Sequence, residues 1–109
     1  MEHPSAIRPE QHAVFNVQKM GKSTLFESAR ILVGLNSFEL GQEHALHAHA
    51  GLDKVYLVLE GRGRFLLEGE EIPMEPGTML VAPEGVPHGI RNTSDGRLVI
   101  LAILAPGPS

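Results

Sequence analysis

The sequence predicts an all-β chain, folded as a sandwich or a barrel, and two observations carry this prediction. Short apolar stretches rich in β-branched residues alternate with turns rich in Gly and Pro along most of the chain. The chain has 109 residues, which suffices for one hydrophobic core without disulfide staples. No internal repeat and no linker divides it, so a single β domain is expected.

The beginning of the chain is the least regular part. Residues 1–13 are expected to form a loose arm, because two prolines interrupt regular structure there. Residues 14–20 are the first expected strand and residues 29–40 the second. A buried helix over residues 24–35 is an alternative that apolar periodicity leaves open. The strand–turn pattern of the remaining chain favours a strand.

From residue 45 onward the alternation of strands and turns is regular. The expected strands are residues 45–48, 54–60, 62–68, 78–82, 88–92 and 98–105. The barrel domain is therefore expected to cover residues 14–105. Residues 106–109 contain two prolines and form a short tail.

Composition excludes several classes of function. The formal net charge is −4 and basic residues are scattered, which argues against nucleic acid as a partner. No apolar run approaches the length of a membrane span, and the polar N-terminus predicts a cytoplasmic protein. Without cysteine there is no thiolate nucleophile, iron–sulfur cluster or Cys-ligated zinc.

Three histidines form the candidate site. His47 and His49 are two residues apart, so on a strand their side chains point to the same side. His88 follows a Pro/Gly turn that can bring it to the same point. Because neutral imidazole is a common ligand of transition metals, the sequence predicts a divalent Fe, Mn, Ni or Zn inside a small barrel.

Two spaced motifs surround these histidines. Gly41 to Gly61 reads G-x5-H-x-H-x4-K-x6-G, and Gly77 to Asn92 reads G-x5-P-x-G-x2-H-x3-N. They resemble the two signature motifs of the cupin superfamily, and the chain resembles a small single-domain cupin. The resemblance implies a jelly-roll β-barrel with a metal near one mouth. It also implies that His47, His49 and His88 bind the metal.

The chain departs from the cupin pattern at one ligand position. The resemblance implies a carboxylate seven residues before Gly61, where this chain has Lys54. Strand alternation places Lys54 inside the barrel with Tyr56, whereas Asp53 faces away. An ammonium group cannot bind a metal.

Three accounts of this departure compete. Asp53 could reach inward through a β-bulge. The three histidines could hold the metal alone, which leaves positions open for substrate and is the account that the sequence favours. Finally, Lys54 could be the functional group and pair with an anionic ligand instead of a metal.

The expected function follows from the same residues. The first hypothesis is a metalloenzyme with dioxygenase, isomerase or lyase activity on a small molecule, in which Lys54 and Tyr56 are candidate catalytic residues. The alternative is a binding or sensing module for a small, anionic ligand, with a structural metal or none. A metal-free barrel that mainly dimerises is the third. His44 is expected outside the site, and a homodimer formed through edge strands is expected.

Overall fold

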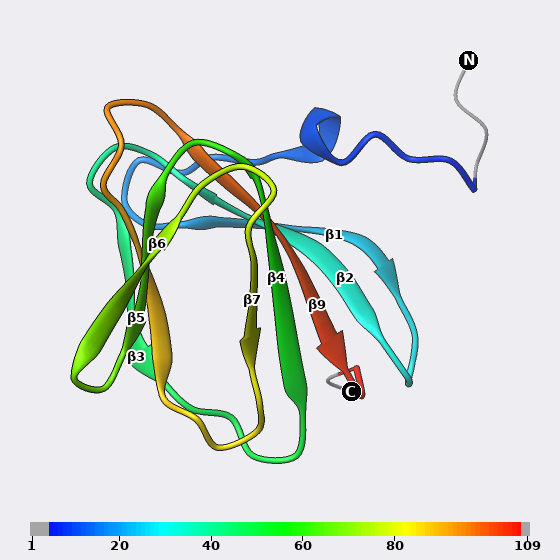
Figure 1. The fold of residues 1–109 in the computed structure, drawn as a ribbon. Coiled ribbons are helices and arrows are strands. Elements are labelled where there is room, and N and C mark those ends of the chain that lie inside the picture. Colours follow the sequence, from blue (N-terminus) through cyan, green and yellow to red (C-terminus); the bar gives the residue numbers. More distant parts are fainter. Residues whose placement is uncertain (1–4, 108–109) are drawn as a thin grey trace.

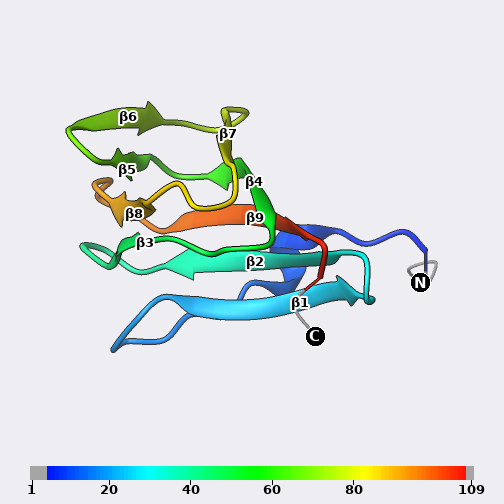
Figure 2. The same cartoon turned by 90° about the horizontal axis from the view of Figure 1, so that it is seen from below.

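The computed structural model describes residues 5–107 as two antiparallel sheets that face each other, which confirms the predicted jelly-roll barrel (Figures 1 and 2). Residues 1–4 of the expected arm and residues 108–109 of the expected tail lie outside the described residues. The strands are β1 Gly21–Glu27, β2 Leu32–Phe38, β3 Glu43–His47, β4 Asp53–Glu60, β5 Gly63–Leu67, β6 Glu70–Met74, β7 Met79–Ala82, β8 His88–Asn92 and β9 Leu98–Ala105.

One sheet has the order β1-β2-β9-β4-β7 and the other the order β3-β8-β5-β6. Chain segments that are distant in sequence therefore become neighbours, as β9 does between β2 and β4. At one end of the barrel the β3–β4 loop meets the β7–β8 loop (Figure 1), where the Gly85 amide donates to the His49 carbonyl at 2.9 Å. Gly85 has a φ of 77°, a backbone conformation that residues with a Cβ rarely adopt. This contact joins the two motifs.

Apolar side chains fill the interior between the sheets. The buried core comprises Met20, Phe38, Tyr56, Val58, Phe65, Met74, Leu80, Ala82, Ile90, Leu98, Ile100 and Ala102. Alternation along β4 sends Lys54, Tyr56 and Val58 inward together, so the interior changes from apolar to polar along one strand. The polar part of the interior is the candidate site.

The expected strand over residues 14–20 is wrong, because the first strand begins at Gly21. The Asn16 side chain accepts a hydrogen bond from the Gln18 amide at 2.8 Å, and residues 17–19 bend. Such a local side-chain bond competes with strand pairing. Val17 remains 89% exposed, which shows that apolar character alone did not give this segment a partner strand.

Two further differences concern residues 24–35 and β6. The helical alternative over residues 24–35 is wrong, because this range belongs to β1, a turn and β2. The sequence assigned no strand to residues 70–74, which form β6 at a sheet edge, where Pro73 is tolerated. Within residues 5–107, the helical structure is one 3-10 turn at Pro9–His12, and no helix there could cross a membrane.

Candidate functional site

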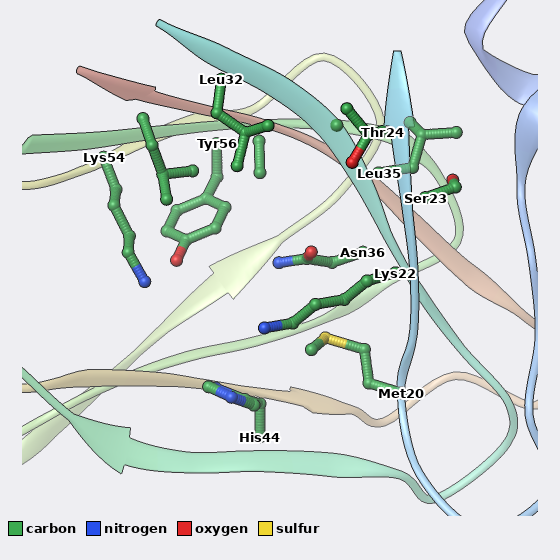
Figure 3. A pocket seen from close by; sticks show the side chains of 13 residues that line it. Met20, Lys22, Ser23, Thr24, Leu32, Leu35, Asn36, His44, Lys54 and Tyr56 are labelled. Atoms are coloured by element: carbon green, nitrogen blue, oxygen red, sulfur yellow. The ribbon is translucent and has the colours of Figure 1, made fainter. Parts of the chain in front are cut away.

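A cavity of about 110 Å³ lies between the sheets at the polar end of the interior. Its polar lining includes Lys22 from β1, Asn36 from β2, His44 from β3, and Lys54 and Tyr56 from β4. Figure 3 shows these five side chains directed toward the same space. Gly34 and Ala102 pair with each other beside Tyr56 and line the cavity, and at Gly34 the Ser23 carbonyl approaches so closely that a Cβ would collide with it.

Lys54 lies inside the barrel, as strand alternation predicts. It is only 8% exposed, and its Nζ lies 3.2 Å from His47 Nε2. Burial lowers the pKa of Lys54, and the nearby Lys22 lowers it further. Within residues 5–107, neither lysine forms a salt bridge with a carboxylate.

His47 and His88 are held in matching ways. Each ring lies with Nδ1 3.0 Å from a backbone carbonyl, that of Ala45 for His47 and that of Val86 for His88. With Nδ1 donating, each Nε2 is an acceptor. Lys54 donates to His47 Nε2, and the Tyr56 hydroxyl donates to His88 Nε2 at 3.1 Å. Burial lowers the pKa of both histidines, so both are neutral near pH 7.

His49 lies at the rim of this group. Its side chain is exposed, and its ring centroid lies 5.1 Å from that of His47. The His47 and His88 rings are 4.4 Å apart, centroid to centroid. The structure therefore brings the three predicted histidines together, with His49 in contact with solvent.

The expectation that His44 lies outside the site is wrong. Its ring is 4.2 Å from the His47 ring, and its side chain lines the cavity. On β3, His44 pairs with Ile90 and His47 pairs with His88, so two residues of β3, Ala45 and Leu46, stand opposite the single residue Gly89 of β8. This β-bulge reverses the alternation that the sequence suggested. Burial, followed by the charge of a protonated His47 and that of Lys22, lowers the pKa of His44 to about 4.

Sequence reasoning also missed Lys22 and Asn36. They pair with each other across β1 and β2, on the face that lines the cavity. The signal that could have found them is strand alternation in β1. It was lost because the first strand was expected to end at Met20.

Asp53 does not reach the histidines. It pairs in regular register with Ala105, so no bulge re-aims it. Its Oδ1 accepts a hydrogen bond from the Glu84 amide at 2.9 Å, on the outer side of the loop contact. Asp53 therefore stabilises the junction of the two motif loops.

The described arrangement does not fit a metal bound by the three histidines. The Lys54 ammonium occupies the lone pair of His47 Nε2, and the Tyr56 hydroxyl occupies that of His88 Nε2. Within residues 5–107, no three His, Asp or Glu side chains converge as a set of metal ligands. Metal binding at these histidines would require Lys54 and Tyr56 to move away.

The cavity carries positive charge without a carboxylate to balance it. Lys22 and Lys54 line it together with His44, and no Asp or Glu side chain is among its lining residues. Lys54 is buried and its hydrogen-bond partner, His47, is neutral, so an anion beside Lys54 and the exposed Lys22 would balance a charge that is costly to bury. The cavity is therefore suited to a small anion.

Comparison with known proteins agrees with this fold. A family profile described as "Cupin domain" matches residues 34–104, which is more than half of the chain. The chain belongs to the cupin family. The structure of the protein TT1209 from Thermus thermophilus superposes with a TM-score of 0.85 at 39% identity, covering 91% of this chain and 94% of that chain.

Two curated relatives have descriptive names. An oxalate-binding protein from Thermotoga maritima is 27% identical over 103 residues, covering 94% of this chain and 84% of that protein. A glucose-6-phosphate isomerase from Pyrococcus horikoshii is 45% identical over 64 residues, covering 52% of this chain. This chain spans 34% of that isomerase and about half of two further curated relatives.

Proposed function

We propose that this cupin binds a small organic anion in the barrel cavity, through Lys54 and Lys22. The observation that carries the proposal is the buried Lys54 ammonium at the position where the cupin pattern has a metal-binding carboxylate. Of the three accounts of this departure, the geometry supports the one in which Lys54 is the functional group.

The lining residues suit a carboxylate or a phosphate. Lys54 and Lys22 provide charge-assisted hydrogen bonds, which are roughly twice as strong as neutral ones. The Asn36 amide adds a neutral donor near the same point (Figure 3), whereas the single Tyr56 hydroxyl proton is already donated to His88 Nε2. Lys54 is buried, which strengthens its interaction with an anion, whereas Lys22 is exposed and contributes less.

The comparisons support the same ligand class. The Thermotoga relative is named for binding oxalate, a small dianion, and it matches most of this chain. The isomerases are named for a phosphorylated sugar, which is also an anion. Both names are compatible with an anionic ligand here.

The direct test is calorimetric titration of the protein with oxalate and with inorganic phosphate. We expect saturable binding of at least one of them. Lys54→Met should weaken it by at least about tenfold, since a hydrogen bond to a charged group contributes about 1.5–3 kcal/mol. Arg64→Ala is the matched control, because Arg64 is an exposed cation outside the cavity lining. Equal binding by the Lys54→Met variant would contradict the proposal.

A metalloenzyme is the second candidate, and one observation favours it. The Nδ1 atoms of His47 and His88 lie within hydrogen-bond distance of backbone carbonyls, which fixes the tautomer whose Nε2 can bind a metal. His47, His49 and His88 would hold the ion only after Lys54 and Tyr56 move away from the Nε2 atoms of His47 and His88, and the ion would then act as a Lewis acid. Metal content per chain, measured by mass spectrometry on protein purified without chelators, tests this. Stoichiometric metal that is lost in a His47→Ala variant would support the second candidate over the first.

We also propose a homodimer, formed through the outer face of the larger sheet instead of through strand edges. Val55 and Leu57 alternate with the inward residues of β4 and therefore face outward. Register aligns two outward aliphatic rows across the sheet: Val33, Ile103, Val55 and Val81, and then Leu101, Leu57 and Met79. Met79 and Val81 are 62% and 51% exposed. An apolar face of this extent is typical of an interaction surface.

A further inference from the structure

A second hollow adjoins the anion cavity. This groove has a volume of about 450 Å³ and lies between the N-terminal segment and strands β1 and β3. Its lining includes Phe15, Lys19, Met20, Lys22, Glu43 and His44. Three of these residues, Met20, Lys22 and His44, also line the cavity. The two spaces therefore meet at a shared wall.

The outer wall of the groove is residues 14–20, and it is anchored at three points. The Gln42 side-chain amide donates to the Asn16 carbonyl at 2.6 Å. The Arg97 guanidinium lies 4.0 Å from the centre of the Phe15 ring, a cation–π contact. At Gly21 the backbone packs so closely against the Val14 carbonyl that a Cβ would collide with it. These three contacts hold residues 14–20 in place along the groove.

The distribution of cations is uneven. The chain has three lysines, Lys19, Lys22 and Lys54, and all three line these two spaces. No arginine lines either space, and Arg62, Arg91 and Arg97 are paired with glutamates. Glu43, the acid of the groove, pairs with Arg91 at 2.8 Å. The lysines form no salt bridge within residues 5–107.

The three lysines follow one another from the cavity to the groove. Lys54 lies in the cavity alone, Lys22 in the wall that both spaces share, and Lys19 in the groove alone. A ligand with a single compact charge can use only the inner lysines. A ligand with a charged group at each end can use the inner and the outer ones together.

We infer that the ligand is an extended dianion, such as a dicarboxylate longer than oxalate, with one charged group beside Lys54 and the other in the groove near Lys19. This inference rests on the proposed function, because it assumes that the cavity takes the first anionic group. Residues 14–20 would then decide which ligands fit, since they form the outer wall of the groove.

The test is a calorimetric titration with linear dicarboxylates from oxalate to pimelate, at low and at high salt. We expect the tightest binding at a chain longer than oxalate. Lys19→Ala should weaken binding of the longer acids, by up to about fivefold for one exposed charge pair, and leave oxalate within twofold. Arg64→Ala, which removes the same charge elsewhere, should change neither.

Distinct results separate the two proposals. If oxalate binds most tightly and Lys19→Ala affects no chain length, the extended-dianion inference is wrong and anion binding in the cavity stands. If no dicarboxylate and no phosphate binds, both proposals are wrong. Monomethyl esters of the longer acids serve as a further readout. The native protein should bind these esters more weakly than it binds the diacids. The Lys19→Ala variant should bind an ester and the corresponding diacid with equal affinity.

Discussion

Lys54 decides the chemistry of the site at the residue scale. It stands in the register where the cupin pattern has a carboxylate, and its ammonium donates to the histidine that would otherwise bind a metal. Lys54 places a cation where the cupin pattern has a metal-binding carboxylate, so we expect metal binding and anion binding to oppose each other.

Lys54→Glu should reverse that balance. We expect affinity for Zn²⁺ or Mn²⁺ to rise by about tenfold or more, because a carboxylate would join His47 and His88. Oxalate binding should be lost, because like charges repel. Competition titration against a chelator measures the first effect and calorimetry the second. Lys54→Gln is the control that removes the charge without adding a ligand. A glutamate variant that binds metal no better than this control would contradict the argument.

Tyr56 contributes stability through one buried hydrogen bond. It is 2% exposed, and its hydroxyl donates to His88 Nε2. Tyr56→Phe keeps the ring and leaves that nitrogen without its donor. We expect the free energy of unfolding, measured in urea, to fall by about 1–3 kcal/mol. A fall below about 0.3 kcal/mol would show that another donor, such as water, replaces the hydroxyl.

At the element scale, the turns hold the strands in register. Asn92 at the end of β8 is buried, and its Nδ2 lies within hydrogen-bond distance of the carbonyls of Phe38, Glu39 and Gly96. Its Oδ1 accepts from the amide and the hydroxyl of Ser94. One side chain thus joins the β8–β9 turn to the end of β2.

Asn92→Ala should therefore be strongly destabilising. We expect a loss of about 2–4 kcal/mol in the free energy of unfolding, because several buried carbonyls lose their donor. The neighbouring Thr93→Ala is the control, since Thr93 is exposed, and it should change stability by less than about 0.5 kcal/mol. Urea unfolding of both variants measures the difference. Similar values for the two would contradict this role of Asn92.

The N-terminal segment is a second element whose position is testable. In a Gly21→Ala variant the new methyl group would meet the Val14 carbonyl oxygen, so residues 14–15 must shift. We expect faster limited proteolysis in this segment and unchanged cleavage elsewhere. Gly96→Ala is the matched control, because a Cβ there meets no atom within 4 Å. Equal proteolysis of both variants would show that the segment does not depend on Gly21.

At the scale of the whole molecule, the outer face of the larger sheet is the surface to test. Val81→Glu places a charge in the outward aliphatic rows, at a side chain that is already 51% exposed. The folded chain should tolerate it, and we expect the sedimentation mass to change from dimer to monomer. Arg64→Glu on the other sheet should leave the dimer intact. A native protein that sediments as a monomer at micromolar concentration would contradict the proposed dimer.

The sequence alone determined the fold class and the inward register of β4. Strand–turn spacing and period-two alternation are local properties, so Lys54, Tyr56 and the histidine pair could be assigned from the residues. The jelly-roll arrangement of the strands was implied by the resemblance of the two motifs to those of cupins, because local patterns do not determine which strands pair.

The tertiary structure decided what local patterns cannot express. The β-bulge in β3 brought His44 into the cavity, and the Asn16 turn moved the first strand to Gly21, which placed Lys22 there. That Lys22 of β1 and Lys54 of β4 line one cavity depends on the tertiary sheet, in which β1 and β4 lie on either side of β2 and β9. Side-chain contacts between strands distant in sequence follow from packing and register, and these arise only when the sheets close.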